Sequence, residues 1–492
     1  MKYLFVSALF SLFSSAYCQT KIESNINHIE NGLSQEVISY DTSSINKMNI
    51  LDRMVYYRVN GVSMAVIENG EVQWSKAYGV SDASTGEKVT TESLFQIASI
   101  GKVITALAAL KLVKDEKIML DEDVNNKLTS WKVAENKFTI KEKVTLRRLL
   151  CHSAGFTDDY GFGGYSVTDS IPPLINIINA QSPANNSKAL IVNYVPGTLM
   201  RYSGGGYLVI QQLIEDITGM SFTNYVEKEI FKPLNLQSST YNYFPDRIKG
   251  IKIARGHDEN GKIDAKEKYH VYPESAAAGF WSTPGDLAKV LIEMQQEYKG
   301  ASNKILNQQL LDSMLTPQFQ VTDRGLGVAL KGAEHVDGFW HAGQNAGYNS
   351  LMYATTNTGQ GAVVMLNSDG DIELAVEIMR SIANENKWPF MQTKLATRES
   401  QDTLNERIGT YRSKQGIFWK ISRKGNDLVL QYRDPHQSRL SSPVNLYQIE
   451  QGHYIIKEEL DLLDFQFSSD NGVKKFILHK YGGTKIVLER TD

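Results

Sequence analysis

The feature that most constrains the fold is the return of strand-like patterns after a long helical middle. Val62–Ile67 and Val72–Tyr78 flank the turn residues Glu68-Asn69-Gly70, which indicates a β-hairpin. Strand-like runs return from Gly325 onward, separated by Gly-rich turns: Gly327–Leu330, Gly338–His341, Tyr348–Thr355 and Gly361–Asn367. We therefore predict an α+β fold in which both parts form one antiparallel sheet, flanked by helices and interrupted by a mostly helical insertion.

The helices of this fold are indicated by apolar periodicity and by end signals. One begins near Ser99 and continues to Val113, and Tyr207–Ile217 is amphipathic and followed by Gly219. Phe222–Phe231 is expected to stop at Pro233, and Thr283-Pro284 is a start signal for a further helix. Another helix, Glu373–Ala383, follows the last strand of the sheet.

The C-terminal part has a different composition. After a linker around Trp388–Arg398, the chain consists of short alternating strands, which at this spacing indicate a small barrel or sandwich. They are Trp419–Arg423, Leu428–Tyr432, Tyr447–Glu450, Tyr454–Lys457, Asp464–Ser468, Lys475–Lys480 and Lys485–Arg490. We therefore expect a larger α+β unit over residues 48–390 and an all-β unit over residues 400–492.

Composition excludes several classes of function. The chain has 492 residues, of which 42% are hydrophobic and 22% charged, as in ordinary globular proteins. The net charge of −3 and the lack of a Lys/Arg-rich run argue against nucleic acid as a partner. The histidines follow neither metalloprotease nor zinc-finger spacing, so we expect no metal and no other cofactor. No pattern indicates an oligomeric state.

The first residues resemble an export signal. Lys2 precedes the apolar run Leu4–Phe13, and small residues before Gln19 favour cleavage after Cys18. We expect residues 1–18 to be a signal peptide, residues 19–47 to be a polar leader, and the mature chain to be secreted or periplasmic. A lipoprotein acylated at Cys18 is the alternative, disfavoured because Tyr17 is bulky. Cleavage after Cys18 leaves Cys151 alone and therefore no intramolecular disulfide.

Ser99-Ile100-Gly101-Lys102 is the first motif that carries chemistry. At positions i and i+3 of a helix the two side chains share a face, so the Lys102 amine can reach the Ser99 hydroxyl and take its proton. The helix N-terminus adds N–H groups beside a developing oxyanion. Ser44-x-x-Lys47 has the same spacing but lies in the polar leader, so context and not spacing selects Ser99.

Two further segments accompany this motif. Tyr202-Ser203-Gly204 lies on a turn before a helix, where a tyrosine can act as a base or relay protons. His341-Ala342-Gly343 ends a strand, and its small residues let a substrate lie along the strand. The N–H of Gln344 is our candidate to complete an oxyanion hole with the N–H of Ser99.

In this order and spacing the three motifs resemble the serine β-lactamase-like superfamily, in particular class C β-lactamases, D-Ala-D-Ala carboxypeptidases and their esterase relatives. Further similar stretches are Leu149–Gly155, Pro196–Tyr207, Ala277–Thr283 and His341–Tyr348. The resemblance implies that Ser99 is the acylated nucleophile, Lys102 its base, Tyr202 a second base and proton shuttle, and His341 the third-motif residue. It also implies a β-lactamase/transpeptidase-like fold and a lipocalin-like C-terminal barrel.

Two departures narrow the expected function. Gly204 stands where the lactamases have an Asn, and His341-Ala342 stands where K-T-G is common. A histidine is charged only below a pKa of about 6.5, so it binds a carboxylate less well than Lys at neutral pH. We therefore expect a secreted serine hydrolase that acts through an acyl-enzyme on a small ester, amide or peptide substrate. A true β-lactamase or penicillin-binding protein, and a non-catalytic binding protein of the same fold, are the alternatives.

Overall fold

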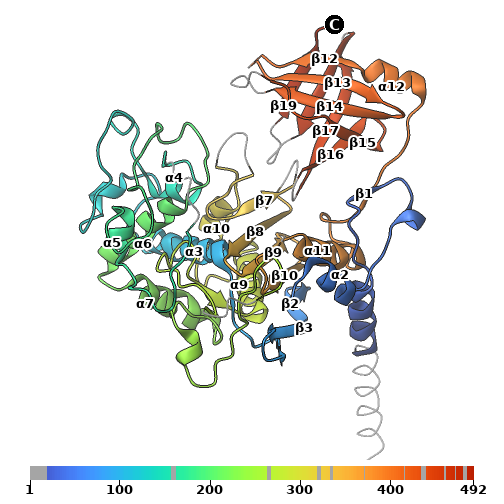
Figure 1. Ribbon diagram of the computed structural model, residues 1–492. Coiled ribbons are helices and arrows are strands. Elements are labelled where there is room, and N and C mark those ends of the chain that lie inside the picture. The colour runs from blue at the N-terminus through green and yellow to red at the C-terminus, as the bar shows by residue number, and fades with distance from the viewer. Residues whose placement is uncertain are drawn as a thin grey trace, which may run out of the picture.

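The computed structural model describes residues 19–156, 162–262, 267–318, 323–332, 336–370, 372–414, 416–433, 439–458, 461–470, 472–479 and 485–492. The expected signal peptide, residues 1–18, lies outside this range. Figure 1 shows a mixed helix-and-sheet unit and, above it, an orange-red barrel formed by the last part of the chain. No helix of the described residues is long and apolar enough to cross a membrane.

A seven-stranded sheet forms the centre of the larger unit. Its order is β4-β3-β2-β10-β9-β8-β7, and every neighbouring pair is antiparallel. The strands are β2 (Gly61–Glu68), β3 (Glu71–Asp82), β4 (Glu87–Lys88), β7 (Ala329–Lys331), β8 (Gly338–Asn345), β9 (Tyr348–Thr355) and β10 (Gly361–Leu366). Pairing of β2 with β10 joins the N-terminal hairpin to the later strands, which confirms the predicted α+β sheet.

Both faces of this sheet are covered by helices, so its central strands β2, β9 and β10 are almost entirely buried. Along β10, side chains alternate between two hydrophobic cores. Val363 and Met365 face the first core, and Ala362, Val364 and Leu366 face the second. The first core contains α3 (Gly101–Lys114) and α9 (Pro284–Tyr298), and the second contains α2 (Ile50–Tyr57) and α11 (Glu373–Glu385). In Figure 1 the sheet lies between these two layers.

The insertion contains less helix than the sequence predicted. Its helices are α4 (Leu146–Leu150), α5 (Leu174–Ile178), α6 (Gly204–Thr218), α7 (Phe222–Val226), α8 (Lys232–Leu234) and, after α9, α10 (Gln308–Met314). Asn136 and Asn186 in the loops, and Asn176 in α5, donate side-chain hydrogen bonds to backbone carbonyls of the loops and of the end of α5.

Pro233 does not end the helix that begins at Phe222. The chain widens into a π-helical turn over Glu227–Phe231 and continues into α8, which contains Pro233. The helical segment ends at Asn235, whose φ of 53° lies in the left-handed region common at helix C-termini. Pro233 lies in the last turn of this segment, directly after the π-helical turn, so the helix ends two residues beyond the proline rather than before it.

The C-terminal unit is a closed barrel of eight sequential strands, β12 to β19. They are β12 (Gly409–Arg412), β13 (Phe418–Lys424), β14 (Asp427–Arg433), β15 (Val444–Glu450), β16 (His453–Glu458), β17 (Asp461–Asp470), β18 (Val473–His479) and β19 (Lys485–Arg490). Helix α12 (Gln401–Arg407) precedes them. The sequence predicted neither α12 nor β12, because both are short. The barrel interior is packed with aromatic rings, including Trp419, Phe465 and Phe476.

The segment before residue 48 packs on the fold, which its polarity did not predict. Residues 19–30 are helical, and Ile29 and Leu33 are fully buried in the core that contains α11. Strand β1 (Ile38–Ser39) pairs in parallel with β11 (Lys394–Leu395). Tyr40 Oη donates a 2.8 Å hydrogen bond to Asp427 Oδ1 of the barrel, so this segment contacts both units.

Candidate active site

Ser99 lies on a tight turn that enters helix α3. Strand β5 (Phe95–Gln96) pairs with β6 (Trp281–Ser282), and the Ile97 N–H donates to Phe280 O at 3.0 Å. Ala98 then has a φ of 48°, in the left-handed region that a residue with a side chain rarely adopts. Ala98–Ile100 form a 3₁₀ turn, so Ser99 stands two residues before α3 begins at Gly101.

Lys102 meets Ser99 as the spacing predicted. Lys102 Nζ donates hydrogen bonds to Ser99 Oγ at 2.9 Å and to Ala277 O at 2.7 Å. The lysine is 2% exposed, whereas Ser99 is partly open to solvent. Two tyrosine rings face the amine, with centroids 5.1 Å (Tyr202) and 5.6 Å (Tyr207) from Nζ. The site therefore joins a reachable hydroxyl to an enclosed amine.

Tyr202 is held at the same place by a histidine. Its ring lies against that of His152, with the centroids 4.3 Å apart, and 42% of the residue is exposed. The backbone on either side is fixed by the same residue: the Arg201 N–H donates to His152 O at 2.8 Å, and the Ser203 N–H donates to His152 Nδ1 at 3.1 Å. Ser203 then caps helix α6 through a 2.9 Å bond from the Gly206 N–H.

His152 is uncharged in this position. Burial, and then the charge of Lys102, lower its pKa well below the ordinary value. Because Nδ1 accepts the Ser203 N–H, the proton of the neutral ring sits on Nε2. The sequence did not reveal the contact of His152 with Tyr202, because 50 residues separate the two in the chain.

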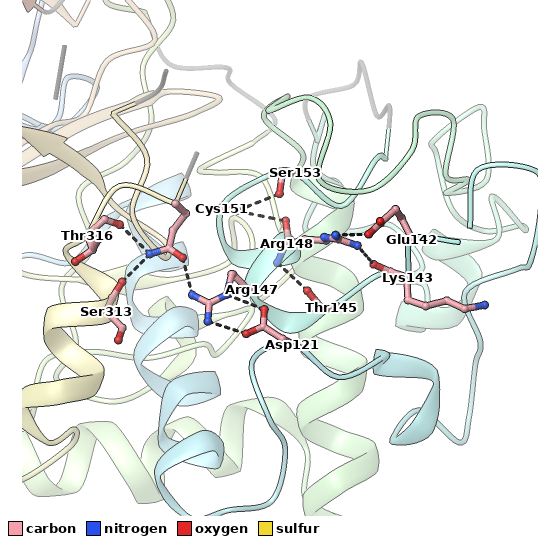
Figure 2. A network of polar contacts seen from close by, with 11 residues as sticks. Asp121, Glu142, Lys143, Thr145, Arg147, Arg148, Cys151, Ser153, Ser313 and Thr316 are labelled. Atoms are coloured by element: carbon pink, nitrogen blue, oxygen red, sulfur yellow. Dashed lines mark hydrogen bonds and ion pairs between the residues drawn. The ribbon is translucent and has the colours of Figure 1, made fainter. Parts of the chain in front are cut away.

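The segment around His152 is anchored by charged residues of α4 (Figure 2). Arg147 donates to both carboxylate oxygens of Asp121, at 2.7 and 2.8 Å, and its third nitrogen donates to Gln318. Arg148 pairs with Glu142 at 2.6 Å, and Cys151 Sγ lies 3.2 Å from Ser153 Oγ. This network fixes the short helix that delivers His152 to the site.

Strand β8 brings the third motif to the Ser99 turn. Gly343 lies so close to this turn that a Cβ atom would come within 2.2 Å of Ile97 O. From the neighbouring strand, Ser350 Oγ donates to the same carbonyl at 3.2 Å. Asn345 Nδ2 donates a 2.8 Å hydrogen bond to Gln96 Oε1. Gln344, which lies between Gly343 and Asn345 in the strand, is exposed. The strand and the turn therefore form one rigid contact beside Ser99.

His341 carries no charge near neutral pH. Burial, followed by the charges of Lys102 and Arg324, lowers its pKa to about 3. Its Nδ1 lies 2.6 Å from Ala342 O, and since a carbonyl only accepts, the ring donates from Nδ1 and leaves Nε2 as an acceptor. His341 is thus buried and neutral, without the charge of the lysine common in this motif.

Arg324 is a residue that the sequence analysis missed. Its charge acts on His152, His341 and Tyr207, all buried beside Lys102. No motif pointed to it, because its nearness depends on how the segment before β7 folds back. Within the described ranges, no group of three or more His, Cys, Asp or Glu side chains is arranged to hold a metal ion.

Known proteins share the sequence pattern and the fold of this chain. The family model described as Beta-lactamase matches residues 48–387. Penicillin-binding protein 4 of Amycolatopsis lactamdurans is 25% identical over 342 residues, which are 67% of this chain and 86% of that protein. The teichoic acid D-alanine hydrolase of Staphylococcus aureus (strain MRSA252) is 28% identical over 276 residues, which are 56% of this chain and 63% of that protein.

Among solved structures, the octameric penicillin-binding protein homologue from Pyrococcus abyssi has a TM-score of 0.53 and 21% identity. The match covers 90% of this chain and 98% of that one. At this level of identity the likeness concerns the fold.

Proposed function

The chain is a serine hydrolase of the beta-lactamase family, and we propose that it cleaves ester or amide bonds through an acyl-enzyme formed on Ser99. The observation that carries this proposal is the 2.9 Å contact between Lys102 Nζ and Ser99 Oγ in a site closed around the amine. A serine hydroxyl is a poor nucleophile until a base at hydrogen-bond distance takes its proton.

In the first half of the reaction, Ser99 Oγ attacks the carbonyl carbon while its proton passes to the Lys102 amine, which acts as the base in its neutral form. The N–H groups of Ser99 and Gln344 stabilise the oxyanion. The bond to the leaving group then breaks, and Tyr202 Oη supplies the proton that this group needs. Tyr202 is suited to this step because its ring is both close to Lys102 and partly open to solvent.

In the second half, water attacks the acyl carbonyl and loses its proton to the Tyr202–Lys102 pair. The acyl group leaves as a carboxylic acid, and Ser99 Oγ recovers its proton. No residue is consumed, so the groups return to their first state. The short distance between the lysine amine and the Tyr202 ring supports the return of the proton by this route.

The site favours simple esters, amides and D-amino-acid derivatives over β-lactams. His341 is neutral and Gly204 has no side-chain amide, so two polar contacts expected for a β-lactam are weakened. The similarity to a teichoic acid D-alanine hydrolase and to a penicillin-binding protein supports substrates with a D-alanyl acyl group.

The substrate proposal is tested by comparing kcat/KM for a p-nitrophenyl acetate, a D-alanyl ester, a D-alanine anilide and nitrocefin on the same preparation. We expect both esters to be cleaved faster than nitrocefin, with Ser99→Ala inactive on all four. A larger kcat/KM for nitrocefin than for the esters would instead assign a true β-lactamase.

We also propose that the enzyme is exported, because Lys2 and the apolar run Leu4–Phe13 precede a cleavage pattern at Cys18. N-terminal sequencing of the protein from its natural host distinguishes a chain that begins at Gln19 from an acylated Cys18. A chain that retains Met1 in the cytoplasm would contradict export.

A further inference from the structure

A polar groove lies in the insertion beside α7, at the lower left of Figure 1. Its volume is about 560 Å³, within the range of small-molecule sites. A second cavity of about 270 Å³ lies next to it on the same segment, because Gln237, Ser239 and Thr240 line both. None of the lining residues belongs to the three catalytic motifs, so this pair of cavities, which we call the insertion groove, is separate from the Ser99 site.

One wall of the insertion groove contains the π-helical turn Glu227–Phe231. Asn224 of α7 and both ends of this turn line the groove. π-helical turns are rare, and they occur frequently at functional sites. The backbone of this wall is therefore of a kind that favours a binding role over plain packing.

The floor of the groove is apolar and rigid. Phe231 and Tyr241 line it, and their rings are stacked with centroids 5.9 Å apart. Both rings also stack on Phe280, at 5.3 and 4.8 Å. Phe280 packs against α3, since a Cβ on Gly101 would lie 3.2 Å from Phe280 Cβ. A ligand therefore meets a surface that is already fixed by the core, which lowers the cost of binding.

Local hydrogen bonds orient the polar side chains of the groove and leave other atoms of the same groups to bind a ligand. Asn242 Oδ1 accepts the Phe244 N–H at 2.8 Å, which leaves Nδ2 as a donor. Asn235 Oδ1 accepts from Gln237 Nε2 at 3.0 Å, which leaves Asn235 Nδ2 to donate and Gln237 Oε1 to accept. Asn224 adds an exposed carboxamide. The groove thus offers both donors and acceptors in fixed positions.

The charges of the groove are largely compensated. Glu227 and Lys232 both line it and form an ion pair of 3.3 Å. In the adjoining cavity, Lys252 pairs with Glu87 at 3.1 Å. Glu92 of that cavity is exposed, so water and salt screen its charge. A charged ligand therefore gains little here, whereas a neutral ligand rich in hydroxyl groups matches the carboxamides and hydroxyls.

We propose that the insertion groove binds a neutral oligosaccharide. Sugar hydroxyls both donate and accept, as the carboxamides of Asn224, Asn235 and Gln237 require. The C–H face of a sugar ring can lie on the apolar floor, and the adjoining cavity gives room for a further sugar unit of the same chain. This inference goes beyond the proposed hydrolysis at Ser99 and does not depend on it.

The test measures the binding of three neutral trisaccharides, chitotriose, maltotriose and cellotriose, by saturation-transfer NMR titration. We expect at least one of them to bind with a Kd of about 0.1–1 mM, a modest affinity that suits an open groove. Asn224→Leu and Gln237→Leu keep the size of the side chain but remove its amide, and each should raise this Kd about fivefold, the loss of one hydrogen bond. Asn445→Leu, on barrel strand β15, is the matched control and should keep the wild-type Kd.

Three results would overturn the proposal. The groove is not a saccharide site if none of the trisaccharides binds at about 10 mM. A trisaccharide whose Kd is the same in both groove variants as in the wild type binds elsewhere. A lower Kd for acetyl-trialanine amide than for every trisaccharide would assign the groove to a neutral peptide. Both replaced side chains are exposed, so both variants should fold, and if thermal unfolding shows one to be destabilised, the other decides.

Discussion

At the residue scale, Ser99 and Lys102 show what sequence spacing can and cannot predict. Side chains at i and i+3 meet on a helix, and the 2.9 Å contact agrees with that expectation. The charge of His341 was not predictable in the same way. It depends on burial by residues far away in the chain and on the charges of Lys102 and Arg324, which only the fold brings together.

Tyr202→Phe separates the chemistry of the hydroxyl from the packing of the ring. The ring contact with His152 stays, so we expect the melting temperature to change little while kcat for an ester falls about 10²–10⁴-fold, the usual contribution of a general acid–base group. Steady-state kinetics with a p-nitrophenyl ester measure this. A kcat within threefold of the wild type would exclude Tyr202 as the proton shuttle.

Tyr207→Phe is the matched control for this variant. Tyr207 also faces Lys102, but its hydroxyl donates to Leu150 O at 3.1 Å and the residue is fully buried. Loss of this bond should cost about 1 kcal/mol of unfolding free energy and leave kcat much less affected than in Tyr202→Phe.

His341 predicts a pH dependence of stability. Its pKa is about 3 in the fold and about 6.5 when unfolded, so the unfolded chain binds more protons between these values. The contribution of His341 is therefore complete above pH 6.5 and falls by about 1.4 kcal/mol per pH unit as the pH drops below it. Buried Glu274, whose pKa is raised to about 7 by burial, acts in the opposite sense, so the wild-type curve alone does not isolate His341.

The measurement is therefore a difference between variants. In urea unfolding at pH 7 and pH 5, His341→Gln should lose less stability on acidification than the wild type, by about 2 kcal/mol over the 1.5 pH units below 6.5. His28→Gln replaces a ring that is 58% exposed and serves as the control. Parallel curves for the wild type and His341→Gln would show that His341 titrates normally in the fold.

At the element scale, long strands and strong helices were predicted best. The run Tyr348–Thr355 coincides with β9 and Lys485–Arg490 with β19, because turn residues bound both. The short elements α12 and β12 were not predicted, and the insertion was predicted to be more helical than it is. There, asparagine side chains and prolines compete with helical hydrogen bonds, which an apolar periodicity does not reveal.

Gly343→Ala tests the contact between β8 and the Ser99 turn. The added Cβ would lie 2.2 Å from Ile97 O, and backbone at that distance must move apart. We expect at least a tenfold slower acylation of Ser99 by a fluorophosphonate, because the shift displaces the proposed Gln344 N–H donor. Gly285→Ala in α9 has nothing within 4 Å of the new Cβ and is the control. Equal acylation rates in both variants would show that this contact does not position the site.

At the scale of the whole molecule, the sequence predicted two units but not how they connect. The buried Ile29 and Leu33 lie in a segment that is otherwise polar, so their role was hidden in its composition. The same segment reaches the barrel through Tyr40, and the β1–β11 pairing ties it to the chain that leads there. Such contacts between distant parts of the chain leave no local periodicity.

The barrel and the sheet unit have separate hydrophobic cores, which predicts separate responses to mutation. Trp419 is 5% exposed and packs edge-on against Phe465 and Phe476. Trp419→Ala should therefore cost the barrel about 3–5 kcal/mol of stability. We expect kcat/KM for an ester to stay within about twofold at temperatures below the barrel transition, a factor equal to less than 0.5 kcal/mol. A loss of activity in proportion to the loss of barrel stability would mean that the two units act as one.

The central claim is that Ser99 carries the acyl group during turnover. Its most direct measurement is the intact mass of the protein, quenched in acid within seconds of mixing with a slowly hydrolysed ester, followed by peptide mapping. We predict a mass increase of one acyl group, located on the peptide that contains Ser99, and no such increase in Ser99→Ala. An adduct on another residue, or an equal adduct in Ser99→Ala while the wild type turns over the ester, would contradict it.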